Sequence, residues 1–403
     1  MRTTFLRGLA TVVSLASLGV LGAAATPAQA AAGDCPTGYF CAWKSESATG
    51  EMYKTNTSRA TLGTWDNKFR SYTNRTSMYA CLYEDANYGL GNGYARAEPD
   101  SPGEWSAGPT ASISSLKFVR TERECGHPAY PRWYAETAPK AAGFGDMNAD
   151  RKADVLVRDK VGRLWFLPGD GTGRMVGSGG WNGMNAFTRH GDLSRDGRED
   201  LLAREASTGK LWLYPGTGSG AVGARKLLGS GGWNAMNRIT AFGDLTGDAR
   251  ADLLTVEKST GKLWLYPGTS TGGLGARKLL GSGWNGMNAL VPAGDMNSDG
   301  RADLVAREAS TGKLWLYPGR AGYFGGRVLI GSGGWNAMDS FIAVGDFTGD
   351  GRADLATVTN DRYTIDGSPG HLGWLVTYAG RGNGALASGT RSDGEWWGLN
   401  GAF

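Results

Sequence analysis

Short apolar runs, separated by clusters of Gly, Ser, Asn and Asp, recur along most of the chain. After about residue 140, each repeat has an apolar lead-in such as 342–344, an acidic turn, and a strand such as 251–257. A Ser-Thr-Gly turn, an apolar strand such as 262–268 and a closing strand such as 276–281 follow. Four short strands, repeated roughly every 50 residues, are typical of β-propeller blades. The Leu-Trp-Leu-Tyr strand is apolar on both faces, which predicts a sheet covered by neighbours on both sides.

The end of the chain bears on how many blades the ring contains. Residues 396–403 align with 233–240 and stop where a sixth acidic turn would begin. Because a closed ring removes unpaired strand edges, we predict five blades in which the two ends of the repeat region meet. A larger ring completed by residues 127–143 is the alternative, but it needs strands that this stretch does not show.

Each acidic turn begins with Gly-Asp and places Asp at turn positions 1, 5 and 9, with Asn, Ser or Thr at position 3. Side-chain oxygens at alternating positions of a tight turn are the ligands that calcium requires. Asp-rich turns also cap strands through their own backbone, but three carboxylates this close repel one another unless a cation lies between them. We therefore predict up to five Ca²⁺ ions, one per blade, with these ligands: Asp146, Asn148, Asp150, Asp154, Asp192, Ser194, Asp196, Asp200, Asp244, Thr246, Asp248, Asp252, Asp295, Asn297, Asp299, Asp303, Asp346, Thr348, Asp350 and Asp354.

Two of the five turns depart from the pattern at position 6. Three turns have Gly there, whereas the first has Arg151 and the third has Ala249. A side chain at this sharp turn costs energy if φ is positive. The sequence therefore leaves open whether blades 1 and 3 hold calcium.

Two series of tryptophans run through the repeats. One series lies in the apolar strand and is predicted to be core: Trp165, Trp212, Trp264, Trp315 and Trp374. The other series lies in Gly-rich turns and ends with Trp396. Each of these indoles either packs between two blades or stacks on a sugar ring, whose hydroxyls the next residue would bond. Packing between blades is the first interpretation, and the sugar site is the alternative. Its candidate ligand-binding residues are Trp181, Asn182, Trp233, Asn234, Trp284, Asn285, Trp335 and Asn336.

The first 30 residues have the features of an export signal. Arg2 and Arg7 precede an apolar run over 10–25, and Ala28-Gln29-Ala30 is a small-x-small cleavage pattern. The apolar run is short for a membrane span, and no later segment is apolar enough to cross a bilayer. We therefore predict a secreted, extracellular protein. Its net charge of +4 gives no reason to expect nucleic acid or an anionic membrane as a partner.

All four cysteines fall before residue 126, outside the repeats. Export permits disulfides, and of the three pairings we predict Cys35–Cys41 with Cys81–Cys125. Alternating apolar bursts and turn residues predict a small all-β domain over 31–126, in which two disulfides would each stabilise a marginal core by ~2–4 kcal/mol. A Pro-rich linker over 127–139 would follow, and the propeller would occupy 140–403.

Three motifs of this domain carry a family resemblance. Cys35-Pro-Thr-Gly-Tyr-Phe-Cys41-Ala-Trp43 resembles the opening of the secreted metalloproteinase-inhibitor family, which has a βγ-crystallin-like Greek-key fold. Residues 66–76 resemble the first crystallin signature of that family, and 83–89 resemble the start of its second Greek key. The resemblance implies a peptidase-inhibitor ancestry and a secreted peptidase as partner. It assigns no reactive-site residue here.

The crystallin-type calcium half-sites of that family are degenerate in this chain. Arg70 replaces a hydroxyl residue in the first signature, and Thr110-Ala111 replaces the acidic or amide pair in the second. We therefore predict no metal in the N-terminal domain.

The five repeats resemble the FG-GAP (VCBS-type) family of β-propellers, in which a calcium-binding turn joins the first two strands of each blade. The resemblance rests on the repeated acidic turns and covers the region after residue 140. It implies extracellular adhesion or ligand binding, and it argues against catalysis in the repeats.

No catalytic motif accompanies these features. The three histidines follow no repeated pattern, and the chain contains no H-E-x-x-H or phosphate loop. We therefore predict a non-enzymatic protein. In one interpretation it inhibits a secreted metallopeptidase or other peptidase. In the alternative it is a lectin-like or adhesive protein that binds cell-wall or extracellular glycans through the propeller.

Overall fold

The computed structural model describes residues 32–106, 112–137 and 144–403, and these form strands and short 3-10 turns without an α-helix. The chain divides into two compact units, 1–116 and 117–403, whereas the sequence places the boundary after residue 126. The expected export signal and the pair Thr110-Ala111 lie outside the described residues. The described part contains no helix long and apolar enough to span a membrane.

Unit 1 is built on two small antiparallel sheets, in the strand orders β2-β1-β3-β6 and β5-β4-β7. Their strands are β1 (Phe40–Trp43), β2 (Met52–Thr55), β3 (Ser71–Asn74), β4 (Tyr79–Tyr83), β5 (Tyr94–Ala97), β6 (Ser101–Ser106) and β7 (Ser115–Val119), the last of which continues into unit 2. The short 3-10 turns of this region are η1 (Ala32–Asp34), η2 (Gly63–Trp65), η3 (Ala86–Tyr88) and η4 (Glu122–Cys125).

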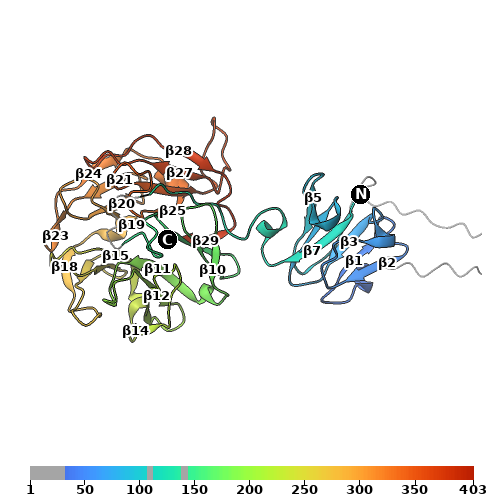
Figure 1. The fold of residues 1–403 in the computed structure, drawn as a ribbon, viewed down its shortest axis with the longest axis horizontal. Helices are drawn as coiled ribbons and strands as arrows, with labels where there is room; N and C mark the ends of the chain where they lie inside the picture. The colour runs from blue at the N-terminus through green and yellow to red at the C-terminus, as the bar shows by residue number, and fades with distance from the viewer. Residues whose placement is uncertain (1–31, 107–111, 138–143) are drawn as a thin grey trace, which may run out of the picture. The chain divides into compact units, whose positions relative to one another are not determined.

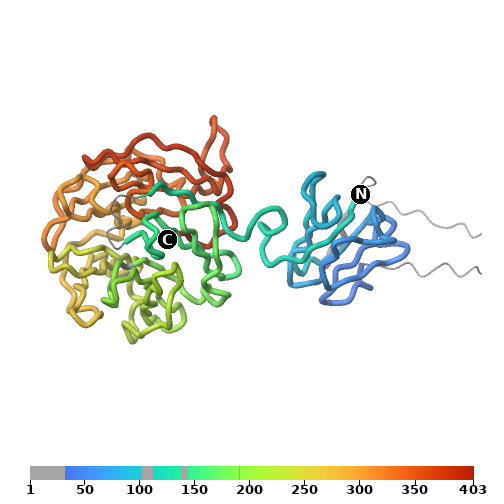
Figure 2. Tube along the Cα trace, viewed as in Figure 1, coloured from blue at the N-terminus to red at the C-terminus, as the bar shows by residue number. Residues whose placement is uncertain are grey.

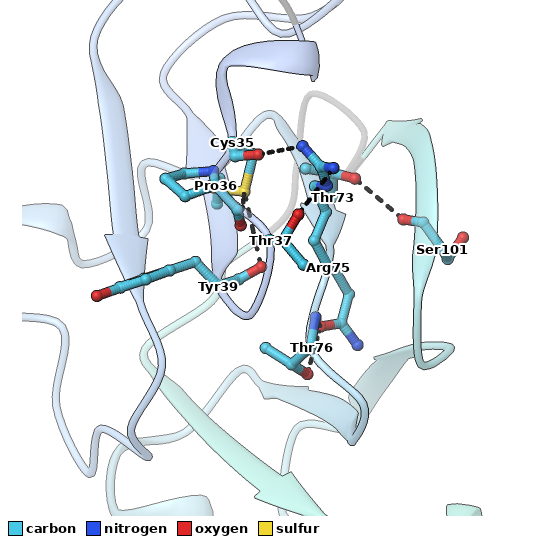
Figure 3. The surroundings of a disulfide bond; sticks show 10 residues. Cys35, Pro36, Thr37, Tyr39, Thr73, Arg75, Thr76 and Ser101 are labelled. Carbon is cyan, nitrogen blue, oxygen red and sulfur yellow. Dashed lines mark hydrogen bonds between the residues drawn. A yellow bond between two sulfur atoms is a disulfide. The ribbon is translucent and has the colours of Figure 1, made fainter.

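The aromatic residues of β1 and its neighbours form the centre of unit 1. Phe40, Trp43 and Phe69 are fully buried. The Cys35–Cys41 disulfide closes the loop before β1, and Arg75 braces this loop by donating to the Cys35 carbonyl oxygen (Figure 3). Cys81 and Cys125 are disulfide-bonded as well.

Unit 2 consists of five four-stranded antiparallel sheets that follow one another around a ring (Figures 1 and 2). The strand orders are β10-β9-β8-β29, β11-β12-β13-β14, β15-β16-β17-β18, β19-β20-β21-β24 and β25-β26-β27-β28, with a separate hairpin of β22 and β23. The C-terminal strand β29 thus completes the sheet that β8 begins, as the meeting of the two ends predicts.

The strand bounds of unit 2 are β8 (Val155–Asp159), β9 (Leu164–Leu167), β10 (Arg174–Gly177), β11 (Met184–His190), β12 (Asp200–Glu205), β13 (Leu211–Tyr214), β14 (Lys226–Gly229), β15 (Met236–Phe242), β16 (Asp252–Glu257), β17 (Leu263–Tyr266), β18 (Lys278–Gly281), β19 (Met287–Gly294), β20 (Asp303–Glu308), β21 (Leu314–Tyr317), β22 (Gly319–Arg320), β23 (Tyr323–Phe324), β24 (Val328–Gly331), β25 (Met338–Ile342), β26 (Leu355–Thr359), β27 (Leu375–Tyr378), β28 (Thr390–Asp393) and β29 (Leu399–Ala402). Short 3-10 turns connect consecutive sheets: η5 (Trp181–Gly183), η6 (Trp233–Ala235), η7 (Trp284–Gly286) and η8 (Trp335–Ala337).

Apolar side chains from adjacent sheets form the core between them. Leu202 and Leu213 of the second sheet, for example, share a buried cluster with Ile239 and Leu253 of the third. Burying a side chain of this size contributes about 1.5–3 kcal/mol. Each sheet is therefore stabilised mainly by its neighbours in the ring.

The tryptophans of the Leu-Trp-Leu-Tyr strand are half-buried, not core as the sequence predicts. In three sheets an arginine just before the outermost strand covers the indole. Arg225 lies 4.0 Å from the centroid of the Trp212 ring, and the pairs Arg277–Trp264 and Arg327–Trp315 have the same spacing. A stacked guanidinium shields an aromatic face while staying in water itself, so this position is not a closed core.

Part of the predicted linker is packed into unit 2. Trp133 is 1% exposed, and its Nε1–H donates to the carbonyl oxygen of Ala153 at 2.7 Å. The Ala135 N–H donates to the carbonyl oxygen of Gly169 at 3.0 Å, and that of Glu136 donates to the carbonyl oxygen of Phe347 at 2.9 Å. The prolines nearby predict an extended chain, and the backbone N–H groups of Ala135 and Glu136 in this chain are held by carbonyl oxygens in loops of unit 2.

Candidate functional site

Each acidic turn leads into the second strand of its sheet; in four of the five sheets it comes from the innermost strand, whereas the innermost strand of the first sheet is β29. In all five, the Asp at position 1 accepts the backbone N–H groups of positions 5 and 6; in the last turn these come from Asp350 and Gly351 to Asp346, at 3.2 and 2.7 Å. The Asp at position 5 accepts the N–H of position 7, as Asp350 does from Arg352 at 3.0 Å. These bonds fold the turn and leave the carboxylates of positions 1 and 5 near the surface.

The Asp at position 9 is buried and holds the turn to the sheet. Asp354 is 1% exposed; its Oδ2 accepts the N–H groups of Phe347 at 3.0 Å and Thr348 at 2.9 Å, and its Oδ1 accepts that of Gly380 at 2.9 Å. Burial raises the pKa of this carboxyl despite those bonds. The same arrangement recurs at Asp200, Asp252 and Asp303.

Asp154, at position 9 of the first turn, differs from the other four. Its Oδ2 accepts the N–H of Met147 at 2.7 Å, but its buried Oδ1 has no hydrogen-bond partner among the described residues. Burial raises its pKa to about 7; Arg189 opposes this shift, while the carboxylates of Asp150 and Asp146 add to it. A buried oxygen without a donor, next to two further carboxylates, is an environment that a cation would stabilise.

The oxygens of positions 1, 3 and 5 have the chemistry that calcium requires, whereas in four of the turns both oxygens of position 9 already accept backbone N–H groups. The described residues contain no group of three His, Cys, Asp or Glu side chains arranged to hold a metal ion. The position-3 side chain bonds within the turn, as where Asn148 Nδ2 donates to Asp150 Oδ2 at 2.9 Å. The donor set therefore fits calcium at positions 1, 3 and 5, with position 9 supporting the turn from the core.

Position 6 has positive φ in every turn, including the two that lack glycine there. The angle is 72° at Arg151 and 62° at Ala249, compared with 82°, 83° and 85° at the three glycines. The left-handed conformation costs an L-residue roughly 1–2 kcal/mol. At position 6 the first and third turns therefore carry this strain, and the first, second and fourth turns carry it at position 4, where Ala149, Arg195 and Ser298 also have positive φ.

The Gly-rich turns place their tryptophans between successive sheets. The Trp233 ring lies 5.1 Å from that of Tyr266, and three equivalent Trp–Tyr pairs lie 4.8–4.9 Å apart. Trp335 is 9% exposed, Trp396 is 1% exposed, and Trp181, Trp233 and Trp284 are half-buried. This geometry favours packing between blades over a sugar site.

The asparagines of these turns are also engaged. The Nδ2 of Asn234 donates to the carbonyl oxygen of Ala206 at 3.0 Å, and Asn182, Asn285 and Asn336 make the same bond in their own sheets. In addition, Asn285 Oδ1 accepts from Asn237 Nδ2 of the preceding sheet at 2.9 Å. The amides thus hold each connecting turn to the sheet that precedes it.

Segment 83–89 leads into a loop that Asp85 holds in place, and Leu90 of this loop is not among the residues that the sequence predicts to be functional. Asp85 Oδ2 accepts the N–H of Asn92 at 3.0 Å, and its Oδ1 accepts from Asn92 Nδ2 at 2.6 Å. These bonds lower the pKa of Asp85. Leu90, inside this loop, is 51% exposed. A lone large apolar residue between two glycines, Gly89 and Gly91, is the sequence signal that identifies it.

Comparison with known proteins agrees with this division of the chain. Residues 28–96 match the model of peptidase inhibitor family I36, and residues 192–255, 244–306 and 295–357 match the model of the FG-GAP-like repeat. No curated protein gives a significant match. A solved Agrocybe aegerita lectin, described as specifically recognising non-reducing terminal N-acetylglucosamine, is 18% identical over 63% of this chain and 67% of its own, with a TM-score of 0.37. The chain therefore combines a module similar to peptidase inhibitor family I36 with a β-propeller-like region of FG-GAP-like repeats.

Proposed function

We propose that this is a secreted, non-enzymatic binding protein whose N-terminal module inhibits an extracellular peptidase, in the first instance a metallopeptidase. The match of residues 28–96 to an inhibitor family carries this proposal. The disulfide-closed start of the module and its buried aromatic centre support it, because a rigid surface loses little entropy on binding. Both matched families are generally non-enzymatic.

In this proposal the propeller presents the inhibitor module and is itself stabilised by calcium. The ions would be held by the oxygens of positions 1, 3 and 5 in each acidic turn, such as Asp346, Thr348 and Asp350. Calcium would supply charge neutralisation and no chemistry. The unpartnered Oδ1 of Asp154 and the crowding of carboxylates in the first turn support a cation there.

A peptidase titration tests the inhibitor proposal. The full-length chain is mixed with a thermolysin-type metallopeptidase, a subtilisin-type and a papain-type enzyme, and residual activity is followed. We expect loss of activity of at least one class at micromolar protein. Reducing the disulfides beforehand should abolish inhibition of the thermolysin-type and subtilisin-type enzymes, because the loop before β1 is then no longer closed. Full activity of all three classes would refute the proposal.

A second candidate function is glycan binding by the propeller. It is favoured by one observation: three of the Gly-rich turns keep the indole half-exposed next to an exposed Asn. Because the amides are engaged, a sugar would contact mainly the indole face. Weak sites repeated around a ring would hold a polymer much better than a monosaccharide, since the second contact is intramolecular. Equal binding of polymer and monosaccharide, or none, would contradict this candidate.

A further inference from the structure

The loop after η3 in unit 1 is fastened at its base to the core of the module. Ser115 is fully buried, and its hydroxyl donates to the carbonyl oxygen of Asp85 at 2.6 Å while accepting the N–H of Tyr88 at 3.0 Å. The Asn87 N–H donates to the carbonyl oxygen of Ala60 at 2.7 Å. Asn87 and Tyr88 both have positive φ, of 56° and 62°. A tyrosine keeps this conformation only where its surroundings enforce it, so the base of the loop is held firmly.

The Asp85 side chain fastens the far side of the same loop. Both of its oxygens accept from Asn92, as described above. A Cβ added at Gly89 would lie 2.7 Å from the Cβ of Asp85, and one added at Gly91 would lie 3.2 Å from its Oδ2. The backbone therefore runs close to the carboxylate on both sides of Leu90, and a larger residue at Gly89 would force Asp85 to move.

Leu90 itself projects from this rigid frame. Among the described side chains of unit 1, two large hydrophobic residues are exposed: Leu90, at 51%, and Tyr94, at 38%. Leu90 lies in this loop, and Tyr94 follows it closely. Gly89 has extended backbone, with φ −64° and ψ 149°. In the part of the chain that the structure describes, neither the N–H nor the carbonyl oxygen of Leu90 has a hydrogen-bond partner. Both backbone groups are thus available to a binding partner.

We infer that Leu90 is the residue of the inhibitor module that enters the specificity pocket of the target peptidase, which then takes large aliphatic side chains. This inference rests on the proposed function. An extended backbone segment with free polar groups pairs with the edge of an enzyme cleft, and its side chain fills a pocket. The bonds to Asp85 and Ser115 fix the loop before binding, which removes the ordering cost that a flexible segment would meet. Moving an exposed apolar side chain from water into an apolar pocket is favourable, so Leu90 would contribute to the affinity.

The experiment compares variants of the full-length chain against whichever peptidase the wild-type chain inhibits. Leu90→Asp should raise the inhibition constant roughly 30-fold or more, the loss typical of a removed hot spot, because a carboxylate is not accommodated in an apolar pocket. Leu90→Ala should weaken inhibition in the same direction, and Leu90→Met should keep it within a few-fold, since its size and polarity are similar. Leu279→Asp is the matched control, because Leu279 is 54% exposed but lies in unit 2.

The outcomes separate this inference from the function on which it rests. If the wild-type chain inhibits no peptidase, the proposed function is wrong and the inference goes with it. If the wild-type chain inhibits but Leu90→Asp and Leu90→Ala inhibit equally well, the inhibitor function stands and the assignment of Leu90 is overturned. Unchanged thermal melting of the variants establishes that a loss reflects the contact and not the fold. Equal weakening by Leu279→Asp would also overturn the assignment.

Discussion

The indole rings of Trp133 and Trp396 meet edge to face inside unit 2, with centroids 6.0 Å apart and planes at 79°. Trp133 precedes the first sheet of the ring and Trp396 follows the last, so residues from the two ends of the repeat region pack together. Phe347, in the last acidic turn, lies against the same indole, 5.2 Å from Trp133. The seam of the ring is therefore closed by side chains as well as by the pairing of β29 with β8.

Trp133→Ala should destabilise unit 2 by ~3–5 kcal/mol, since it leaves a cavity and removes the donor to the Ala153 carbonyl oxygen. Urea unfolding of the full-length chain measures this effect. Tyr134→Ala is the matched control, because the neighbouring Tyr134 is 64% exposed and should change stability far less. Similar losses for both variants would mean that Trp133 does not hold the seam.

The strand order was predictable because the repeats carry it in their hydrophobic pattern. The position of Trp133 was not, since a single aromatic residue among prolines has no periodicity to place it. Trp212 and its equivalents were assigned to the core from their apolar strand. The covering arginine, such as Arg225, comes from the next strand, and sequence alone does not give that pairing.

Gly229→Ala tests whether the indole of Trp233 is fixed between sheets. A Cβ at residue 229 would lie 1.9 Å from Trp233 Nε1, so the indole would have to move, at a cost of ~1–3 kcal/mol. Gly231→Ala is the control, since nothing lies within 4 Å of its Cβ position and its φ is not positive. Thermal melting should fall for the first variant only. Equal melting of both would show a freely moving indole, as an open sugar-stacking surface requires.

The candidate sites were predictable to different degrees. The acidic turns follow from local sequence, because each turn is built from its own backbone and carboxylates. The separate role of Asp354 was not predictable, since it depends on Gly380 in a distant loop. The exposure of Leu90 likewise depends on how Ser115 holds its loop.

Glu124 should make unit 2 lose stability as the pH falls into the acid range. Burial alone would raise its pKa, but the hydrogen bonds and charge of Arg163, at 2.9 Å, together with Thr121, lower it below the ordinary 4.5. A carboxyl whose folded pKa is lowered contributes stability above its unfolded pKa, and the contribution is lost as pH falls through the folded pKa. Glu124→Gln should therefore cost about 1.5–3 kcal/mol at neutral pH and much less in acid.

The measurement for Glu124 is urea unfolding of the wild-type and variant chains from neutral pH down to below pH 4.5, the ordinary value for this group. Glu136→Gln removes a charge from an exposed residue of the same unit and should shift stability little at any pH. A Glu124→Gln difference that stays constant with pH would contradict the ionic origin of the effect.

Calcium should raise the stability of unit 2, and the acidic turns predict which carboxylates are responsible. Extracellular sites bind calcium with dissociation constants of ~10⁻⁴–10⁻³ M, so a tenfold excess stabilises the fold by about 1.4 kcal/mol for each occupied site. Thermal melting of the full-length chain with calcium and with a chelator measures the sum. An identical midpoint in both conditions would refute calcium binding by the turns.

Two substitutions in the last turn separate a ligand from a structural carboxylate. Asp350→Asn keeps an oxygen to accept the Arg352 N–H but removes a charge from the exposed side of the turn. It should lower the melting midpoint in calcium and leave it nearly unchanged in chelator. Asp354→Asn should lower the midpoint in both conditions, because its carboxylate accepts three backbone N–H groups from inside the fold and an amide replaces one oxygen by a donor. If Asp350→Asn behaves like Asp354→Asn, both carboxylates act through the backbone, and the turn needs no ion to explain its sequence.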